Sequence, residues 1–170
     1  HSSVAQARKL WACLDAFSGG TIVLGQSSPI CVCPPSPVGG ILQIDRLLRQ
    51  RGLREKSRLV FFTPFPRAYP AEPIDEIVAP IFKERGIETL TFFDVDHIDT
   101  AARKIVSIEG DEITYDLPII VPPFGGSQIA YTPANVVDAD AFIGTDKQTL
   151  QVKGFENVYV LGTQKEIDRA

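Results

Sequence analysis

The sequence has no methionine and few cysteines. It contains 170 residues, and its three cysteines are at positions 13, 31 and 33. Because three cysteines cannot all pair within one chain, a disulfide scaffold is disfavoured and a reducing compartment is expected. Methionine is missing even from position one, and residues 1–3 (His-Ser-Ser) resemble the remnant of an affinity tag. These two features predict an excised piece of a longer protein.

Clusters of basic residues and long apolar runs are also absent. The formal net charge is −4 and the isoelectric point is about 5.2, so a nucleic acid partner is not expected. No apolar run reaches the roughly 18 residues that a membrane-spanning helix needs, and the polar start does not resemble a secretory signal. A content of 44% hydrophobic and 22% charged residues is typical of a globular domain. A cytoplasmic location is expected for the chain itself.

Glycine is scarce in a loop where many nucleotide-binding proteins have several. An apolar run at 21–24 is followed by the loop, residues 25–39, and then by an amphipathic run. In a dinucleotide-binding fold, glycines in such a strand–loop–helix unit let the backbone approach a pyrophosphate. Here the loop begins and ends with glycine but has none between, and it holds prolines, Cys31 and Cys33. The pattern disfavours a nicotinamide cofactor and indicates cysteine chemistry.

The order of apolar runs predicts an α/β fold. Helical periodicity alternates with short apolar runs up to residue 93, which predicts parallel strands joined by helices. Shorter runs within about 94–116, with a Glu-Gly-Asp turn, predict a small antiparallel insertion. A continuous apolar run at 117–121 then returns to the sheet. We predict a Rossmann-like three-layer domain with a parallel sheet over residues 4–126, followed by a returning segment over 127–170.

Four local patterns carry further expectations. Cys13 falls among the apolar positions of the first helix, so it is expected in the core. Pro80 lies inside a helical pattern and should kink or restart that helix. A last buried strand is expected at 157–162. The arginines at 46, 49, 51 and 54 are expected on the solvent face of a helix, with phosphate binding as the alternative.

A metal site is not predicted. Zinc needs four ligands, and beyond the cysteines and the tag residue only His97 is available. Asp94, Asp96 and Asp99 lie near this histidine, but no Asp-x-Asp-x-Asp-Gly loop follows. We therefore expect these side chains to be solvated groups on a short antiparallel strand.

Several motifs resemble those of one flavoprotein family. Residues 33–37 (Cys-Pro-Pro-Ser-Pro) resemble the cysteine turn after the first strand of the nucleotide-type domain in sulfide:quinone oxidoreductases and flavocytochrome c sulfide dehydrogenases. Residues 113–124 resemble that family's segment of Tyr-Asp, an apolar strand and Pro-Pro. Residues 154–162 resemble the strand that ends beside the flavin. The chain is thus similar, over roughly residues 18–163, to a central fragment of this group of FAD-dependent pyridine nucleotide-disulfide oxidoreductases.

The resemblance implies part of a sulfide-oxidising enzyme. In the parent protein, sulfide would attack a cysteine disulfide or persulfide, and an electron pair would pass to FAD and then to a quinone or cytochrome. Cys33 would carry the sulfur, positioned by the loop prolines and favoured as a thiolate by the helix dipole and unpaired N–H groups. Cys31 takes that role if the alignment slips by two residues. The implied flavin contacts are Pro123, Phe124, Gly162 and Thr163.

The resemblance also implies partners and a location. The parent would act on sulfide or a related sulfur compound and on a quinone, and a homodimer is a further alternative. FAD is expected in the full-length parent and not in this fragment. A peripheral membrane location is the alternative to a cytoplasmic one, because the quinone-reducing branch has membrane-binding helices.

Three departures from the family pattern leave other functions open. Thr163 stands where the family has a flavin-binding aspartate, residues 38–39 (Val-Gly) replace Tyr-Glu, and Ile143 lies near the position of a second redox cysteine. These departures favour a degenerate Rossmann-like module for ligand binding or dimerisation without catalysis. A segment of an NAD(P)H:quinone reductase is a third alternative. It would need the missing glycines and an acid after the second strand, where Thr63 stands.

Overall fold

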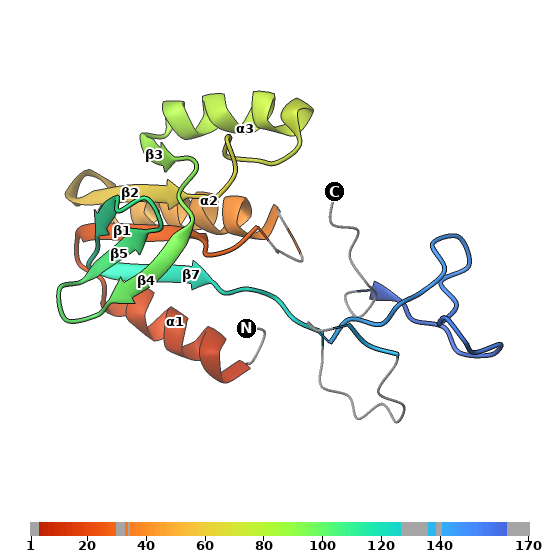
Figure 1. The fold of residues 1–170 in the computed structure, drawn as a ribbon. Coiled ribbons are helices and arrows are strands. Elements are labelled where there is room, and N and C mark those ends of the chain that lie inside the picture. Colours follow the sequence, from red (N-terminus) through yellow and green to blue (C-terminus); the bar gives the residue numbers. More distant parts are fainter. Residues whose placement is uncertain (1–3, 30–32, 34, 127–135, 139–140, 163–170) are drawn as a thin grey trace. The chain divides into compact units, whose positions relative to one another are not determined.

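Four parallel strands form the main sheet of the protein (Figure 1). The computed structural model describes residues 4–29, 33, 35–126, 136–138 and 141–162, and the chain divides into two compact units, His1–Pro123 and Phe124–Ala170. The elements, all in the first unit, are α1 (Val4–Ala16), β1 (Gly20–Gln26), α2 (Pro35–Gln50), η1 (Arg54–Lys56), β2 (Ser57–Phe62), α3 (Glu72–Glu84), β3 (Ile87–Leu90), β4 (Val95–Asp99), β5 (Lys104–Ser107), β6 (Glu112–Thr114) and β7 (Leu117–Val121).

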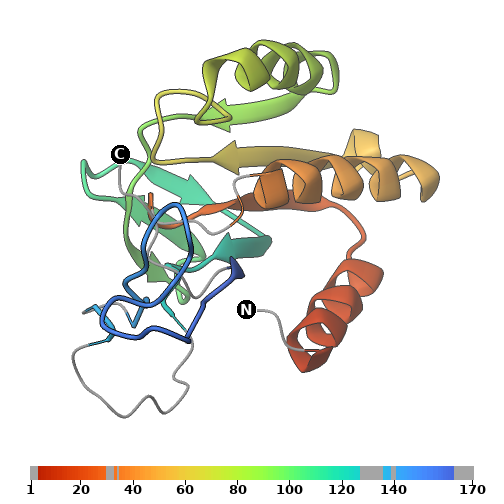
Figure 2. The same cartoon turned by 90° about the vertical axis from the view of Figure 1, so that its right-hand side faces the viewer.

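Two sheets and a helical layer make up the first unit (Figures 1 and 2). The parallel sheet has the order β3-β2-β1-β7, and an antiparallel sheet has the order β4-β5-β6. Side chains of a strand alternate between its two faces, so each central strand serves two cores. Ile22 and Leu24 pack in the core shared with the helices, whereas Val23 packs in the core shared with the antiparallel sheet. The predicted α/β fold with a parallel sheet and an antiparallel insertion is confirmed.

Two neighbouring phenylalanines of β2 show how one strand holds both layers. Phe61 lies edge-on to Phe82 of α3, with ring centroids 5.2 Å apart. Phe62 points to the opposite face and lies edge-on to Phe93, at 5.5 Å. All four rings are buried, and edge-to-face pairs of this kind stabilise a core beyond the apolar area that they bury.

Two predicted details of the secondary structure, a helix restart and a last strand, are wrong. α3 runs from Glu72 to Glu84 without a break, so the helix does not restart at Pro80, whereas a kink there stays a prediction. Pro80 is exposed, so the carbonyl left without its helical partner can be hydrated. The expected strand at 157–162 is absent from the described residues, where Tyr159 forms only an isolated bridge with Gln151. Tyr159 and Leu161 are exposed and only Val160 is buried, because no neighbouring strand pairs along this run.

The second unit has a small apolar core of its own. Val136, Ile143, Val152 and Val160 pack together in it. Around them the described chain forms turns and isolated bridges rather than named strands. One turn is fixed by Asp146, whose carboxylate accepts hydrogen bonds from the Thr149 amide and hydroxyl and the Gln148 amide. These bonds hold the pKa of Asp146 below its ordinary value.

None of the helices in the part of the chain that the structure describes combines the length and the apolar composition needed to cross a bilayer.

A glycine pair gives the first test of this packing. Gly25→Ala is expected to lower the free energy of unfolding by at least about 2 kcal/mol, because its methyl group would collide with the Phe62 carbonyl of the paired strand. Gly39→Ala is the matched control. A methyl group there meets nothing within 4 Å, and alanine in a helix is favoured over glycine by about 1 kcal/mol. Urea unfolding measures both changes, and equal effects would contradict the packing described for β1 and β2.

Candidate functional site

The carboxyl edge of the parallel sheet is the place where a site is expected. β1 lies between β2 and β7, and all three run in the same direction. The connections after β1 and after β7 therefore leave the sheet side by side, where the strand order reverses. Ligands of open α/β sheets bind at this position. The Cys33 loop follows β1 and the Pro122-Pro123 segment follows β7, so both predicted segments start there.

Hydrogen bonds close the gap between these two strands. The Ser27 amide donates to the Val121 carbonyl at 3.0 Å, and the Ser27 hydroxyl donates to the same oxygen at 3.1 Å. Gln26 is buried, and its side-chain amide donates to the Ser28 carbonyl at 3.2 Å. Strand pairing therefore continues where a glycine turn would open a pyrophosphate cradle. The start of the cysteine loop is fixed in place by its neighbours.

The first turn of α2 is a poor anion site. Pro35 and Pro37 have no N–H group, and the Ser36 amide donates to the Cys33 carbonyl at 2.9 Å. The first three residues of the helix thus offer no unpaired N–H to a phosphate or to a thiolate. The expectation that unpaired N–H groups stabilise the Cys33 thiolate is wrong for these residues, and only the helix dipole remains.

The structure describes two of the three cysteines, and both are free and exposed. Cys33 lies two residues before α2, close to the amino end of the helix as predicted, and it is exposed. Cys31 lies outside the described residues. Cys13 was expected in the core, but it is exposed because α1 buries only Leu14. Helical periodicity gives the apolar face of α1 correctly, yet it does not say how much of that face a neighbour covers.

The predicted flavin contacts are divided between the two units and stay predictions. Pro123 ends the first unit, and Phe124 and Gly162 belong to the second. The Phe124 ring packs against Phe142, with centroids 5.8 Å apart. Gly162 has a positive φ of 74° and open space beside its Cα, so the backbone there is accessible. Thr163 lies outside the described residues.

The position expected to hold a second redox cysteine in part of the family is a packing position here. Ile143 is fully buried in the core of the second unit. An apolar side chain in this place cannot exchange sulfur with a cysteine. Its role in this protein is to stabilise the second unit.

The arginines of the α2 region mostly have structural partners, which the sequence did not reveal. Asp45 is fully buried. Its carboxylate accepts hydrogen bonds from Arg54 at 2.7 Å, Arg49 at 3.0 Å and Arg85 at 3.2 Å. Burial alone would raise the pKa of Asp45, but the hydrogen bonds and charges of Arg49 and Arg54 outweigh it, and the pKa lies below its ordinary value.

The predicted exposure is confirmed for Arg46, Arg49 and Arg51 and is wrong for Arg54, whose side chain is only 13% exposed. Arg49 and Arg54 bind Asp45, and Arg51 donates to carbonyls at the end of α1. Arg46 is the one that is exposed with no hydrogen bond or ion pair among the described residues. The spacing of Asp45 and Arg49, four residues apart in a helix, was the available signal for an ion pair.

The Tyr-Asp motif before β7 has a structural explanation. The Asp116 carboxylate accepts the Thr21 amide at 2.8 Å, and Tyr115 is buried. Gly20 is required beside it, because a side chain there would collide with the Asp116 carboxylate. This contact joins the amino ends of β1 and β7, at the edge of the sheet opposite Cys33. Asp116 therefore aligns the two strands and does not contribute to the candidate site.

No metal site is found in the described part of the chain, which contains no suitable group of three or more His, Cys, Asp or Glu side chains. His97 is exposed and its ring contacts the Asp96 carboxylate at 2.8 Å. The nearby acids thus behave as surface groups in the described structure.

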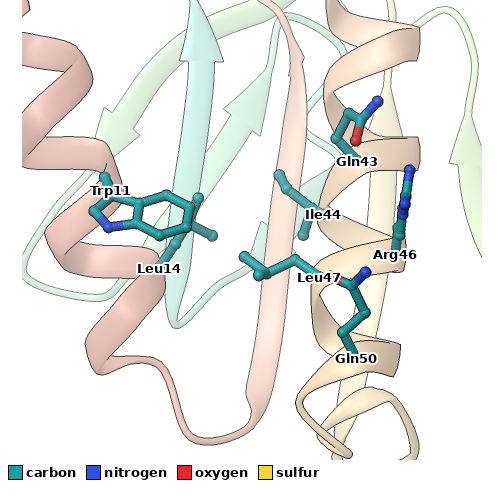
Figure 3. Close-up of a pocket in the computed structure, with 7 residues that line it drawn as sticks. All are labelled: Trp11, Leu14, Gln43, Ile44, Arg46, Leu47 and Gln50. Atoms are coloured by element: carbon teal, nitrogen blue, oxygen red, sulfur yellow. The ribbon is translucent and has the colours of Figure 1, made fainter.

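A groove of about 320 Å³ lies between α1 and α2 (Figure 3). Trp11 and Leu14 line it from α1, and Ile44 and Leu47 line it from α2. The sequence did not predict this groove, because the distance between two helices depends on tertiary contacts.

Comparison with known proteins places the chain beside sulfide oxidoreductases. It is 27% identical to the mitochondrial sulfide:quinone oxidoreductase of Dictyostelium discoideum over 76% of this chain and 29% of the relative. Identity to the mitochondrial enzyme of the same name from Mus musculus is 22%, over 94% of this chain and 37% of the relative. The structure of the sulfide:quinone oxidoreductase from Aquifex aeolicus superimposes with a TM-score of 0.75 and 20% identity, covering 96% of this chain and 38% of that one.

These comparisons confirm the resemblance predicted from the motifs. No family model matches the chain. The chain spans about a third of the length of the curated relatives that it matches. The relatives are therefore informative about family and fold, whereas the activity of a whole enzyme needs separate evidence.

Proposed function

Because the chain resembles sulfide:quinone oxidoreductases over most of its length, we propose that it is the segment of a flavin-dependent sulfide oxidoreductase that carries a sulfur-binding cysteine. The supporting observation is the position of Cys33. It is exposed, and its loop leaves the carboxyl edge of the sheet where Ser27 binds the Val121 carbonyl. A thiol accessible to substrate at this edge suits sulfur chemistry better than nucleotide binding.

The proposed chemistry at Cys33 is the formation of a sulfur–sulfur bond. When the Cys33 thiol and a hydrosulfide ion form a persulfide, an S–S bond is made while one proton and two electrons leave. An acceptor for an electron pair is therefore required, and we propose a quinone as the final acceptor in the parent. Cys31 is the alternative sulfur carrier.

FAD is proposed as a cofactor of the full-length parent and not of this chain alone. Within this chain the Phe124 ring is already packed against Phe142, and Thr163 stands where the family has a flavin-binding aspartate. We expect the purified chain to show no flavin absorbance. A yellow protein with a flavin spectrum would contradict this assignment.

A binding or dimerisation module without catalysis is the second candidate function. It is favoured by Ile143, which is fully buried at a position related to a redox cysteine. An NAD(P)H:quinone reductase segment has less support, because Pro35 and Pro37 remove N–H groups that would bind a pyrophosphate. A homodimer and a peripheral membrane location of the parent stay predictions.

Reduction of the full-length parent separates these functions. Sulfide added anaerobically is expected to bleach the flavin absorbance near 450 nm within minutes of mixing. About one equivalent of sulfide per flavin should be enough, because formation of the persulfide releases the two electrons that reduce one flavin. NADH is the control reductant and should leave the spectrum unchanged. Bleaching by NADH but not by sulfide would overturn the proposal, and a parent without flavin would favour the binding module.

A further inference from the structure

α1 is a helix whose apolar side is mostly uncovered. Of its 13 residues only Leu14 is buried, while Val4 is 70% and Trp11 59% exposed. A helix of this length is marginal in water without tertiary contacts. It is held at its carboxyl end, where Arg51 donates to the carbonyls of Leu14 at 2.6 Å and Asp15 at 2.8 Å. The rest of its apolar stripe is thus held in place without a covering neighbour.

The groove between α1 and α2 continues this stripe. Figure 3 shows Trp11 and Leu14 on one side and Ile44 and Leu47 on the other. Its volume of about 320 Å³ is at the lower end of the range of ligand pockets. A groove of this size, lined by four apolar and three polar side chains from two helices, has room for large apolar side chains of a docked segment but not for a dinucleotide.

The charged side chain among the residues that line the groove is positive, although the chain has a net charge of −4. Asp45 is the sole acidic residue of α2, and it is buried and paired with arginines. Arg46 lines the groove with its charge exposed. On α1, Arg8 and Lys9 are opposed by the single acid Asp15. A partner with acidic side chains is therefore complementary to this surface.

We propose that the groove between α1 and α2 binds the apolar face of an acidic amphipathic helix. Large apolar side chains of the partner would lie against Trp11 and Leu47, and its carboxylates would meet Arg46. A second copy of this chain fits less well, because it would oppose two surfaces of like charge. A flat membrane surface fits less well because Leu14 and Ile44, which line the groove, are buried. The inference is independent of the sulfide chemistry proposed for Cys33.

Trp11 provides the test, because it is the only tryptophan of the chain. The probes are two synthetic helical peptides with leucines at spacings of three and four residues, one flanked by glutamates and the other by lysines. Titration of the full chain with the glutamate peptide is expected to shift the Trp11 emission to shorter wavelength and to saturate. The lysine peptide should bind at least tenfold more weakly.

Two variants locate the binding surface. Arg46→Glu is expected to lower the affinity for the glutamate peptide about tenfold, and Leu47→Asp should abolish binding of this peptide. Lys83→Glu makes the same reversal of charge on α3, away from the groove, and should leave the affinity for the peptide unchanged. Arg46 and Lys83 are exposed, so neither change should disturb folding, which circular dichroism checks. Equal binding of both peptides, a shift only with vesicles of anionic lipid, or a shift only on self-association in sedimentation would each overturn the proposal.

Discussion

Cys33→Ser in the full-length parent is expected to lower the rate of sulfide oxidation by about a thousandfold or more, as loss of a covalent nucleophile does in other enzymes. A serine hydroxyl cannot form the sulfur–sulfur bond, whereas it preserves the size of the side chain. Cys33 is exposed and is not a member of the hydrophobic core clusters of the described residues. Flavin reduction by sulfide, followed in a stopped-flow instrument, measures the change.

The chain offers a matched control for this substitution. Cys13 is also free and exposed, but it lies on α1 away from the carboxyl edge of the sheet. Cys13→Ser should therefore leave the rate unchanged. Full activity of the Cys33→Ser parent would disprove the role of this residue. Loss of activity in Cys31→Ser alone would assign the sulfur to the neighbouring cysteine instead.

Asp45→Asn is expected to lower the free energy of unfolding by about 3 kcal/mol, because removing one partner of a buried ion pair leaves uncompensated charge. Here three guanidinium groups, from Arg49, Arg54 and Arg85, would lose their shared carboxylate. Arg54 also donates to the Arg85 and Gly86 carbonyls, so the loss would affect the turn between α3 and β3. Urea unfolding monitored by circular dichroism measures it.

An ion pair on the surface tests whether burial is the reason for the large effect expected of Asp45→Asn. Glu88→Gln breaks the ion pair between Arg58 and Glu88, in which both side chains are more than 40% exposed. This substitution should lower the free energy of unfolding by less than about 1 kcal/mol. If Asp45→Asn costs no more than Glu88→Gln, the Asp45 cluster does not stabilise the fold in the way described.

The pH dependence of stability follows from the same carboxylate. The pKa of Asp45 is lowered in the folded chain from its ordinary value of 3.8. The stabilisation that the Asp45 carboxylate contributes is therefore complete at pH values above this ordinary pKa. It is lost as the pH falls through the lower pKa of the folded state. The difference in stability between the natural chain and Asp45→Asn should shrink as the pH falls below about 4.

The sequence predicted the fold well because its strands are apolar and short. The run at 21–24 and the return at 117–121 correspond to β1 and β7, and the insertion corresponds to β4, β5 and β6. The apolar run at 157–162 was wrongly predicted to be a strand, because apolar content was again the criterion. Apolar content marks a strand only where a partner strand exists, and the described part of the second unit offers only an isolated bridge.

The candidate site was only partly predictable. The position of Cys33 before a helix follows from the order of strand, loop and helix. The bond between Ser27 and Val121 joins residues 94 positions apart, and local patterns carry no information about it. The partners of Asp45 come from α2, η1 and the residue after α3. One of these was visible as a helical spacing, whereas the other two depend on tertiary packing.

The pairing of β1 with β7 has a consequence for how this protein is made. β1 is a central strand only after β7 has joined it, and Thr21 and Asp116, which align the two, are 95 positions apart. At typical translation rates, about 5 to 20 seconds separate the synthesis of these residues. During that time one edge of an apolar strand stays unpaired and can associate with other chains. Release of nascent chains before β7 is complete would therefore favour aggregation over folding.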